Sequence, residues 1–215
     1  MMLTNIYYRL WKLKERFLEK MVLKKMASLV TMIGNGHYCS SQSVVKLCWG
    51  STKYDVVFLT NCQIFGEILS YNHGKVSIGE WSQLGINSVI NCVNSIEIGD
   101  DVMIAAHCII VDHNYHPINP VDRKILNRTP HGSWERAPMC SLSAPIKIEN
   151  NVWLGNYVRI CKGVTIGENS IIGANSVVTK DIPANCIAVG NPARVVKENI
   201  DKFTMSVLTN RNYVE

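Results

Sequence analysis

Aliphatic residues recur at every sixth position over much of this 215-residue chain. The longest run comprises Ile148, Leu154, Ile160, Ile166, Ile172 and Val178, and shorter runs comprise Ile78, Leu84 and Ile90, then Ile98, Ile104 and Ile110. Neither the 3.6-residue period of an α-helix nor the two-residue period of a strand sustains this spacing alone. The spacing therefore predicts short strands separated by corners, with each strand and corner taking six residues.

Three such hexapeptides would complete a triangular coil, so that each residue lies beside the residue 18 positions later. This register pairs aliphatic residues with each other, for example Ile148 with Ile166. The fourth residue after each aliphatic one is small or β-branched, as a crowded interior requires: Val152, Val158, Val164, Ser170, Ser176 and Ile182. Residues that tolerate positive φ occupy the expected corners, namely Gly155, Gly167, Gly173, Asn150, Asn156, Asn169 and Asn175. The pattern is typical of a solenoid, whose repeats bury apolar surface by stacking.

Two segments lie outside the repeats. Residues 3–30 carry apolar side chains at three-to-four spacing and predict an amphipathic helix. This helix either packs across one end of the core or, being basic, contacts an anionic membrane. Residues 111–145 interrupt the repeats with several prolines and are too long for an ordinary connection, which indicates a functional loop. We therefore expect a helical segment at 1–36, a β-solenoid domain at 37–197 containing that loop, and a short helix or tail at 198–215.

Composition and charge narrow the class of protein. Hydrophobic residues make up 47% of the chain and charged residues 18%, as in a folded globule. Eight scattered cysteines without a C-x-x-C pair predict reduced thiols in a cytoplasmic protein. No signal peptide and no run of about 20 apolar residues is visible, so we expect neither secretion nor a membrane span. Residues 1–30 hold seven basic and two acidic residues, which accounts for the net charge of +5. No nucleic-acid-binding module accompanies this charge, so we expect no nucleic-acid partner.

Three motifs resemble the hexapeptide-repeat acyltransferases, and among them the sugar O-acetyltransferases, such as the maltose and galactoside enzymes and those of capsule and O-antigen pathways. The motifs are HPINPVDR at 116–123, IKIENNVWLG at 146–155 and GANSVVTKDIPANCIAVGNPARVVK at 173–197. The resemblance, which covers about 78–197, implies an all-β solenoid in the form of a left-handed parallel β-helix. It also implies a homotrimer with active sites in clefts between neighbouring coils, and acetyl-CoA as the acyl donor without a metal. A threefold assembly would cover exposed strand faces of the prism.

The interrupting loop supplies candidate general bases. A sugar hydroxyl becomes a good nucleophile only when a base removes its proton, and histidine has a suitable pKa near 6.5. His116 matches the catalytic His-Pro segment of the family, and His113 matches a similar run in some O-antigen acetyltransferases. We therefore take His116 as the first candidate and His113 as the second. Asp112 would either orient an imidazole or open the loop as an Asx turn.

The resemblance also implies residues that bind the two substrates. Asn87 matches one of two paired asparagines near the acceptor, whereas Gly85 occupies the partner position here. Trp153 matches a tryptophan beside the thioester, with packing against a neighbouring subunit as the alternative, and Trp134 would stack on a sugar ring. The coenzyme A groove would run along Asn156, Gly173 and Ala174, with Thr179, Lys180 and Arg194 at the nucleotide end.

Together these features predict an acetyl-CoA-dependent O-acetyltransferase that acts on a sugar hydroxyl. The expected acceptor is a bacterial surface polysaccharide of the capsule or O-antigen type, or its precursor, and the expected location is the cytoplasm, with possible membrane contact through residues 3–30. An N-acetyltransferase of an amino sugar or xenobiotic is the main alternative. His107, His113 and His116 also leave open a zinc carbonic anhydrase on the same fold, and a catalytically silent trimeric scaffold is a third alternative.

Overall fold

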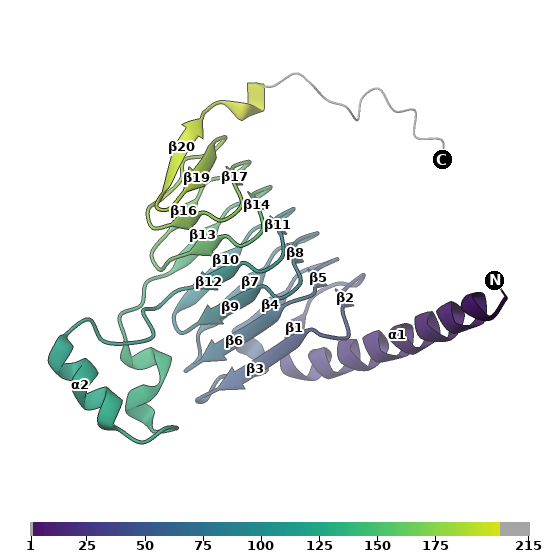
Figure 1. Ribbon diagram of the computed structural model, residues 1–215, viewed down its shortest axis with the longest axis horizontal. Coiled ribbons are helices and arrows are strands. Elements are labelled where there is room, and N and C mark those ends of the chain that lie inside the picture. Colours follow the sequence, from purple (N-terminus) through teal and green to yellow (C-terminus); the bar gives the residue numbers. More distant parts are fainter. Residues whose placement is uncertain (1, 203–215) are drawn as a thin grey trace.

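The computed structural model describes residues 2–202, which form a three-sided column of stacked coils (Figure 1). The first sheet contains β1 (Thr31–Met32), β4 (Val56–Phe58), β7 (Lys75–Ile78), β10 (Ser95–Ile98), β13 (Ile146–Ile148) and β16 (Thr165–Ile166). The second contains β2 (Tyr38–Cys39), β5 (Gln63–Ile64), β8 (Gln83–Leu84), β11 (Met103–Ile104), β14 (Trp153–Leu154), β17 (Ile171–Ile172), β19 (Ile187–Gly190) and β20 (Ala193–Lys197). The third contains β3 (Val44–Cys48), β6 (Glu67–Tyr71), β9 (Val89–Cys92), β12 (Ile109–Val111), β15 (Arg159–Ile160) and β18 (Val177–Val178). Neighbouring strands are parallel except for the antiparallel pair β19 and β20, which ends the column.

The 18-residue register predicted for the C-terminal coils is confirmed. The strand pairings join Ile148 to Ile166, Leu154 to Ile172, and Ile160 to Val178. Before the loop the coils are longer, because Ile78 pairs with Ile98 and Leu84 with Ile104. The two additional residues per coil fall where β9 turns into β10, which explains why the six-residue spacing restarts two positions late.

The interior of the column consists of aliphatic side chains stacked from coil to coil. Along the second sheet Ile104, Leu154 and Ile172 lie directly over one another and are at most 1% exposed. The small and β-branched positions predicted to be internal are all buried: Val152, Val158, Val164, Ser170, Ser176 and Ile182. The Ser170 hydroxyl donates a hydrogen bond to the Pro183 carbonyl at 2.7 Å, so this buried polar group is satisfied.

Most corners place a residue with positive φ three positions after the aliphatic residue. Residues in this conformation include Asn61, Trp81, Asn87, Asp101, His107, Asn151, Tyr157, Asn169 and Asn175. Asn150 and Asn156 come one position earlier than the positive-φ residue. Their side-chain oxygens accept hydrogen bonds from the backbone N–H groups of Asp100 at 2.9 Å and Ala106 at 3.1 Å in the preceding coil. Gly155 serves close approach, since a Cβ there would lie 2.7 Å from the Ala174 nitrogen.

Helix α1 (Met2–Leu29) covers the N-terminal end of the column, where it contacts β1, β2 and β3. Met26 and Val30 are buried, and Val22, Leu23 and Leu29 are partly buried against the core. The N-terminal half of α1 extends beyond the coils (Figure 1). The predicted amphipathic helix is thus present and packs through its C-terminal half. In the described part of the chain, no helix combines the length and the apolar character needed to cross a bilayer.

The inserted loop leaves the column between β12 and β13 on an antiparallel stem. The Asn114 N–H donates to the Leu142 carbonyl at 3.0 Å, and the Ala144 N–H donates to the Asp112 carbonyl at 2.9 Å. These bonds hold the two ends of the loop together at the corner between the third and first sheets. The residues beyond the stem therefore project from a fixed base.

Beyond the stem, the loop contains helix α2 (Pro120–Arg128) and the 3₁₀ turns η2 (Trp134–Arg136) and η3 (Pro138–Cys140). Asn119 caps the start of α2 by accepting a hydrogen bond from the Val121 N–H at 2.8 Å. At the other end, the Arg136 guanidinium donates to the carbonyls of Leu126 at 2.8 Å and Thr129 at 3.0 Å. Both ends of α2 therefore have partners for backbone groups that the helix itself leaves free.

Two further 3₁₀ turns complete the described structure, η1 (Lys53–Asp55) before β4 and η4 (Ile200–Lys202) after β20. The short C-terminal helix or tail predicted at 198–215 is described only as far as η4, and residues 203–215 lie outside the described part. All eight cysteines are free thiols.

Candidate active site

A buried hydrogen-bond network surrounds His113 at the root of the inserted loop. The residue is only 4% exposed. The Tyr115 backbone N–H donates to His113 Nδ1 at 3.0 Å, so the ring proton lies on Nε2, which donates to Asn91 Oδ1 at 3.0 Å. The Asn91 amide donates in turn to the Tyr115 hydroxyl at 3.0 Å. Both imidazole nitrogens of His113 are therefore engaged in fixing the loop to β9.

Burial lowers the pKa of His113 from 6.5 to about 4. Protonation would also place a proton on Nδ1, where the Tyr115 N–H already donates. The neutral imidazole is thus the form that fits this network, and His113 fits a structural role better than that of a general base.

Lowering the pH from 6.5 toward 4 should destabilise the protein through His113. The imidazole of His113 takes up a proton near pH 6.5 in the unfolded chain but only near pH 4 in the folded chain. The stabilisation that His113 gives the folded state is therefore fully present above pH 6.5 and is lost as the pH falls to 4. The loss in free energy of unfolding should reach ~3 kcal/mol. Urea unfolding at neutral pH and at the lower end of this range should show a larger loss for the wild type than for His113→Asn. Equal losses in the two proteins would contradict the assignment.

Asp112 connects the loop to the preceding coil. Its side chain is fully buried, and its carboxylate accepts hydrogen bonds from the backbone N–H groups of Val93 at 3.0 Å and Asn94 at 2.7 Å. Burial raises the pKa of Asp112, whereas these donors lower it. The carboxylate contacts the backbone of another coil and no imidazole, so in this structure Asp112 orients the loop stem.

His116 differs from His113 in its surroundings. It is exposed, and its imidazole has no hydrogen-bond partner among residues 2–202. It lies between the fixed stem and the capped start of α2, at Asn119. Of the two histidines near the loop root, His116 is therefore the one whose ring nitrogens are available to a bound molecule, and His131, further along the loop, is exposed as well.

A groove of about 360 Å³ between the loop root and the third sheet brings together two predicted site residues, His113 and Thr179. Arg159 and Lys162 also line it, and both side chains are partly buried. Within the described residues neither cation forms an ion pair, and no carboxylate lines the groove. The groove can therefore accept an anionic group. Sequence reasoning missed both cations, although they flank the aliphatic position Ile160.

The residues predicted for the coenzyme A groove lie in two places. Trp153 and Arg194 belong to strands of the second sheet, with Asn156, Gly173 and Ala174 at its corner with the third sheet. Thr179 and Lys180 instead follow β18, at the corner between the third and first sheets from which the inserted loop leaves. Trp153 is 48% exposed on the outer face of the second sheet, where Met103 and Ile171 are its strand neighbours. At the corner, the Asn175 N–H donates to the Asn156 carbonyl at 2.9 Å, linking successive coils. The other residues of this set are the partly buried Gly173 and the exposed Ala174, Thr179, Lys180 and Arg194.

The inserted loop and the second-sheet part of the predicted coenzyme A groove lie on opposite sides of one column. The loop that carries His116 leaves from the corner between the third and first sheets, which is the corner opposite the second sheet that carries Trp153. In Figure 1, α2 and β14 accordingly lie on different sides of the column. One chain alone therefore does not bring the loop to the second-sheet face.

The remaining two predicted residues lie apart from His113. The Trp134 ring packs edge-on against Trp49, with ring centroids 5.8 Å apart, while the residue stays 51% exposed. Asn87 lies at a corner with positive φ and lines a separate groove of about 270 Å³ with Phe65 and Glu67. The structure thus places neither residue beside a predicted base within one chain.

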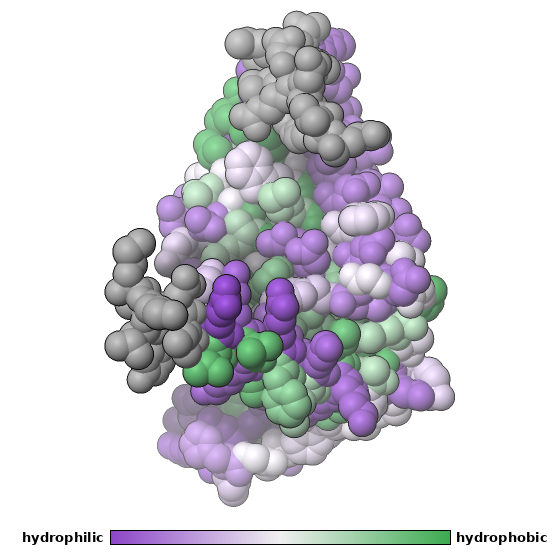
Figure 2. Space-filling view, turned by 90° about the vertical axis from the view of Figure 1, so that its right-hand side faces the viewer, coloured by the Kyte–Doolittle hydropathy of each residue, from purple (hydrophilic) through white to green (hydrophobic). Residues whose placement is uncertain are grey.

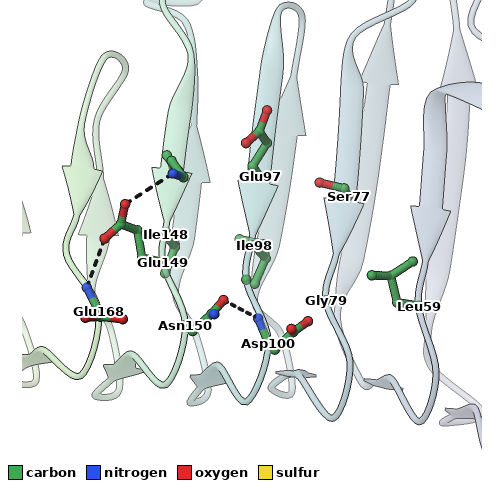
Figure 3. A pocket seen from close by; sticks show the side chains of 12 residues that line it. Leu59, Ser77, Gly79, Glu97, Ile98, Asp100, Ile148, Glu149, Asn150 and Glu168 are labelled. Carbon is green, nitrogen blue, oxygen red and sulfur yellow. Dashed lines mark hydrogen bonds and ion pairs between the residues drawn. The ribbon is translucent and has the colours of Figure 1, made fainter.

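An acidic groove of about 390 Å³ runs across the first sheet (Figure 3). Its polar side chains connect successive coils. The Asn150 oxygen accepts from the Asp100 N–H at 2.9 Å, and Glu149 pairs with Lys147 at 3.1 Å and accepts from the Glu168 N–H at 3.2 Å. None of the predicted site residues lines this groove, so we assign it a structural role.

Two of the three histidines considered for a zinc site, His107 and His113, have separate partners within one chain. The His107 ring stacks on Tyr157 with a centroid distance of 4.7 Å, and His113 is engaged with Asn91 and Tyr115. Among residues 2–202, no group of three or more histidine, cysteine, aspartate or glutamate side chains is arranged to hold a metal ion.

Two family models match the repeats on either side of the loop. Residues 75–110 match the hexapeptide repeat of succinyl-transferase, and residues 145–180 match the bacterial transferase hexapeptide of six repeats. Among the curated relatives is the galactoside O-acetyltransferase of Escherichia coli K12, to which the chain is 40% identical over 133 residues. These 133 residues cover 61% of this chain and 59% of that protein. The chain is 34% identical over 131 residues to a putative acetyltransferase of Schizosaccharomyces pombe, which is 60% of this chain and 56% of the relative. The chain thus spans less than two thirds of each of these relatives.

Solved structures show the same fold. The N-acyltransferase AntD of Bacillus cereus, solved with dTDP and 3-hydroxybutyryl-CoA, superposes with a TM-score of 0.63 at 21% identity, over 83% of this chain and 87% of that one. A hexapeptide-repeat acetyltransferase of Vibrio cholerae superposes with a TM-score of 0.52 at 25% identity, over 84% of this chain and 80% of that one. The predicted left-handed parallel β-helix is thereby confirmed.

Proposed function

The chain belongs to the hexapeptide-repeat acyltransferase family, and we propose that it transfers an acetyl group from acetyl-CoA to a sugar hydroxyl. The observation that carries this proposal is the contrast between two loop histidines. His113 is buried and fixes the loop, whereas His116 is exposed and has no partner among the described residues. A free imidazole close to the fixed root of the loop suits general base catalysis at neutral pH.

In the proposed reaction His116 removes the proton of the acceptor hydroxyl as its oxygen attacks the thioester carbonyl that acetyl-CoA supplies. The carbon–sulfur bond then breaks, and His116 returns the proton to the departing thiolate. Trp153 would lie beside the thioester and shield it from water. The small residues Gly173 and Ala174 would let the extended pantetheine arm approach the wall of the column.

We further propose that the active site forms between subunits of a homotrimer. The loop of one chain and the second sheet of the same chain lie on opposite sides of the column. A threefold arrangement would bring the loop of one copy to the second sheet of its neighbour. It would also cover Met103 and Trp153, which are 54% and 48% exposed in the single chain.

Glu in place of Lys180 should raise the KM for acetyl-CoA severalfold and leave kcat nearly unchanged. Lys180 is exposed directly after Thr179, where the family resemblance puts the nucleotide phosphates, and a carboxylate would repel them. Steady-state kinetics with each substrate varied in turn would measure this. Lys53→Glu, at the other end of the column, is the matched control. An unchanged KM for Lys180→Glu would contradict the placement.

Lys162→Glu tests which substrate supplies the anionic group for the groove beside His113. A rise in the KM for acetyl-CoA, like that of Lys180→Glu, would assign the groove to the phosphates of the donor. A rise in the KM for the acceptor alone would instead indicate an acidic sugar. In either case the positive charge of Arg159 and Lys162 would bind the anionic group, and replacing Lys162 with an acidic residue would weaken that binding.

The proposed acceptor is a bacterial surface polysaccharide of the capsule or O-antigen type, or its precursor, and the reaction would take place in the cytoplasm where its donor is made. Purified protein with acetyl-CoA and a panel of glycans, free sugars and amino sugars should give a product heavier by one acetyl group in mass spectrometry. Mild alkali should remove that group, because an ester hydrolyses where an amide survives. An alkali-stable product would support N-acetylation instead, and no acetylation of any acceptor would refute the proposal.

A further inference from the structure

The two acidic residues of α1 both face the column. Ser41 donates a hydrogen bond to Glu15 at 3.1 Å, and the Tyr38 hydroxyl donates to Glu19 at 2.5 Å. The bond to Glu19 raises the pKa of Tyr38 to about 12, and burial adds to this rise. Both carboxylates thus have partners on the column side, and the opposite side of the helix carries neither of them.

A stripe of exposed apolar side chains runs along α1 on the side away from these two carboxylates. One edge of the stripe, at Leu13 and Phe17, also lines a groove of about 440 Å³ against Tyr38 and Cys39 of the column. Leu10, Leu13, Phe17 and Met21 are spaced by three or four residues and so lie on one face of the helix. They are 58%, 61%, 64% and 56% exposed. The apolar stripe of a surface helix normally packs against the core of the protein. In α1 a different set of side chains, including Val22, Leu23 and Met26, makes that contact.

Basic residues flank this stripe. Seven cations lie between residues 9 and 25: Arg9, Lys12, Lys14, Arg16, Lys20, Lys24 and Lys25. At about 100° per residue, Lys14 and Lys25 lie on one side of the stripe and Arg16 and Lys20 on the other. None of the seven forms an ion pair with another residue of the described chain. In Figure 2, strongly hydrophilic and strongly hydrophobic side chains lie side by side on the lower part of the face toward which α1 points.

We propose that α1 docks flat on an anionic lipid bilayer, with the stripe in the headgroup and acyl boundary and the flanking cations on the lipid phosphates. An apolar stripe bordered by lysine and arginine is the composition that favours this position. The charge pattern also argues against pairing with α1 of a second copy, because that contact would bring two basic helices together. The inference concerns attachment alone and does not depend on acetyl transfer.

Docking through α1 would orient the whole molecule. The inserted loop lies toward the same end of the column as α1, and the C-terminal coils lie at the other end (Figure 1). A bilayer beneath α1 would therefore hold the loop near the membrane surface. An acceptor displayed at that surface would reach His116 more readily than one free in solution.

Co-sedimentation of the full chain with vesicles tests the proposal. The protein should bind phosphatidylcholine vesicles that contain about one third phosphatidylserine, and binding should weaken as salt shortens the screening length. Phe17→Glu should lower the apparent affinity at least tenfold. Ile125→Glu, which replaces a side chain with 62% exposure on α2, is the matched control and should bind as the wild type does.

Light scattering and an activity assay separate the alternatives. Phe17→Glu should keep the wild-type mass and the wild-type rate with a soluble acceptor. A lowered mass together with unchanged vesicle binding would show that the stripe packs against a second copy, and would overturn the proposal. Wild-type protein that fails to bind anionic vesicles, or that binds pure phosphatidylcholine equally well, would overturn it too.

Discussion

His116→Ala should lower the rate of acetyl transfer by about 10²- to 10⁴-fold, which is the usual contribution of a general base. The reason is that His116 is the exposed histidine directly after the loop stem, with ring nitrogens that no described residue engages. Release of the coenzyme A thiol, followed continuously with a thiol reagent, would measure the rate. The KM for acetyl-CoA should stay close to its wild-type value, because in the proposed reaction the imidazole would contact the acceptor and not the nucleotide.

Two other loop histidines supply the controls. His131→Ala removes an exposed imidazole further along the loop and should leave the rate unchanged. His113→Asn removes the buried imidazole. It should lower the free energy of unfolding while changing the rate of acetyl transfer by the folded protein only slightly. If His116→Ala worked at the wild-type rate while His113→Asn lost activity without losing stability, the general base would be His113 and the present assignment would be wrong.

The coil register was predictable from the sequence because one physical requirement determines it. Each aliphatic residue must lie over another one to exclude water, so the pairing of Leu154 with Ile172 follows from the spacing alone. The coils near the N-terminus were harder to predict. There Ile68 pairs with Ile90 at a distance of 22 residues, so a fixed period does not describe them. The additional residues of these coils lie in the longer strands of the third sheet, such as β6.

The corners were only partly predictable. Asn169 and Asn175 adopt positive φ as expected, whereas Asn150, Asn156 and the three corner glycines do not. Trp81, His107 and Tyr157 adopt positive φ although no such preference was expected there. Histidine is enriched in that conformation, but tryptophan and tyrosine have no such preference. The stacking of neighbouring coils imposes it, and this tertiary constraint leaves no local signal in the sequence.

Candidate site residues could be named from the sequence, but their arrangement in space could not. Asn119 followed by Pro120 is a recognisable helix start, so α2 could have been anticipated within the loop. The roles of the two histidines could not, because only the structure shows that Asn91 engages His113. The groove cations Arg159 and Lys162 depend in the same way on the fold, which brings the loop root beside β15.

Leu154→Ala should lower the free energy of unfolding by about 2–5 kcal/mol. The side chain is fully buried between Ile104 and Ile172 in the adjacent coils, so its removal leaves a void that the rigid stack on either side closes poorly. Urea unfolding would measure the loss, at one protein concentration for all variants because dissociation of an oligomer would be coupled to unfolding.

Met103→Ala is the matched control on the same sheet. Met103 lies on the outer face of β11, next to the buried Ile104, and is 54% exposed. Because the proposed trimer would cover Met103, both variants are measured at a protein concentration where light scattering gives the mass of a monomer. Under that condition the replacement should change the free energy of unfolding by less than about 1 kcal/mol. The difference between the two variants isolates the contribution of internal stacking, because strand, sheet and coil are shared. If Leu154→Ala cost no more than Met103→Ala, stacked aliphatic residues would not be what holds the coils together.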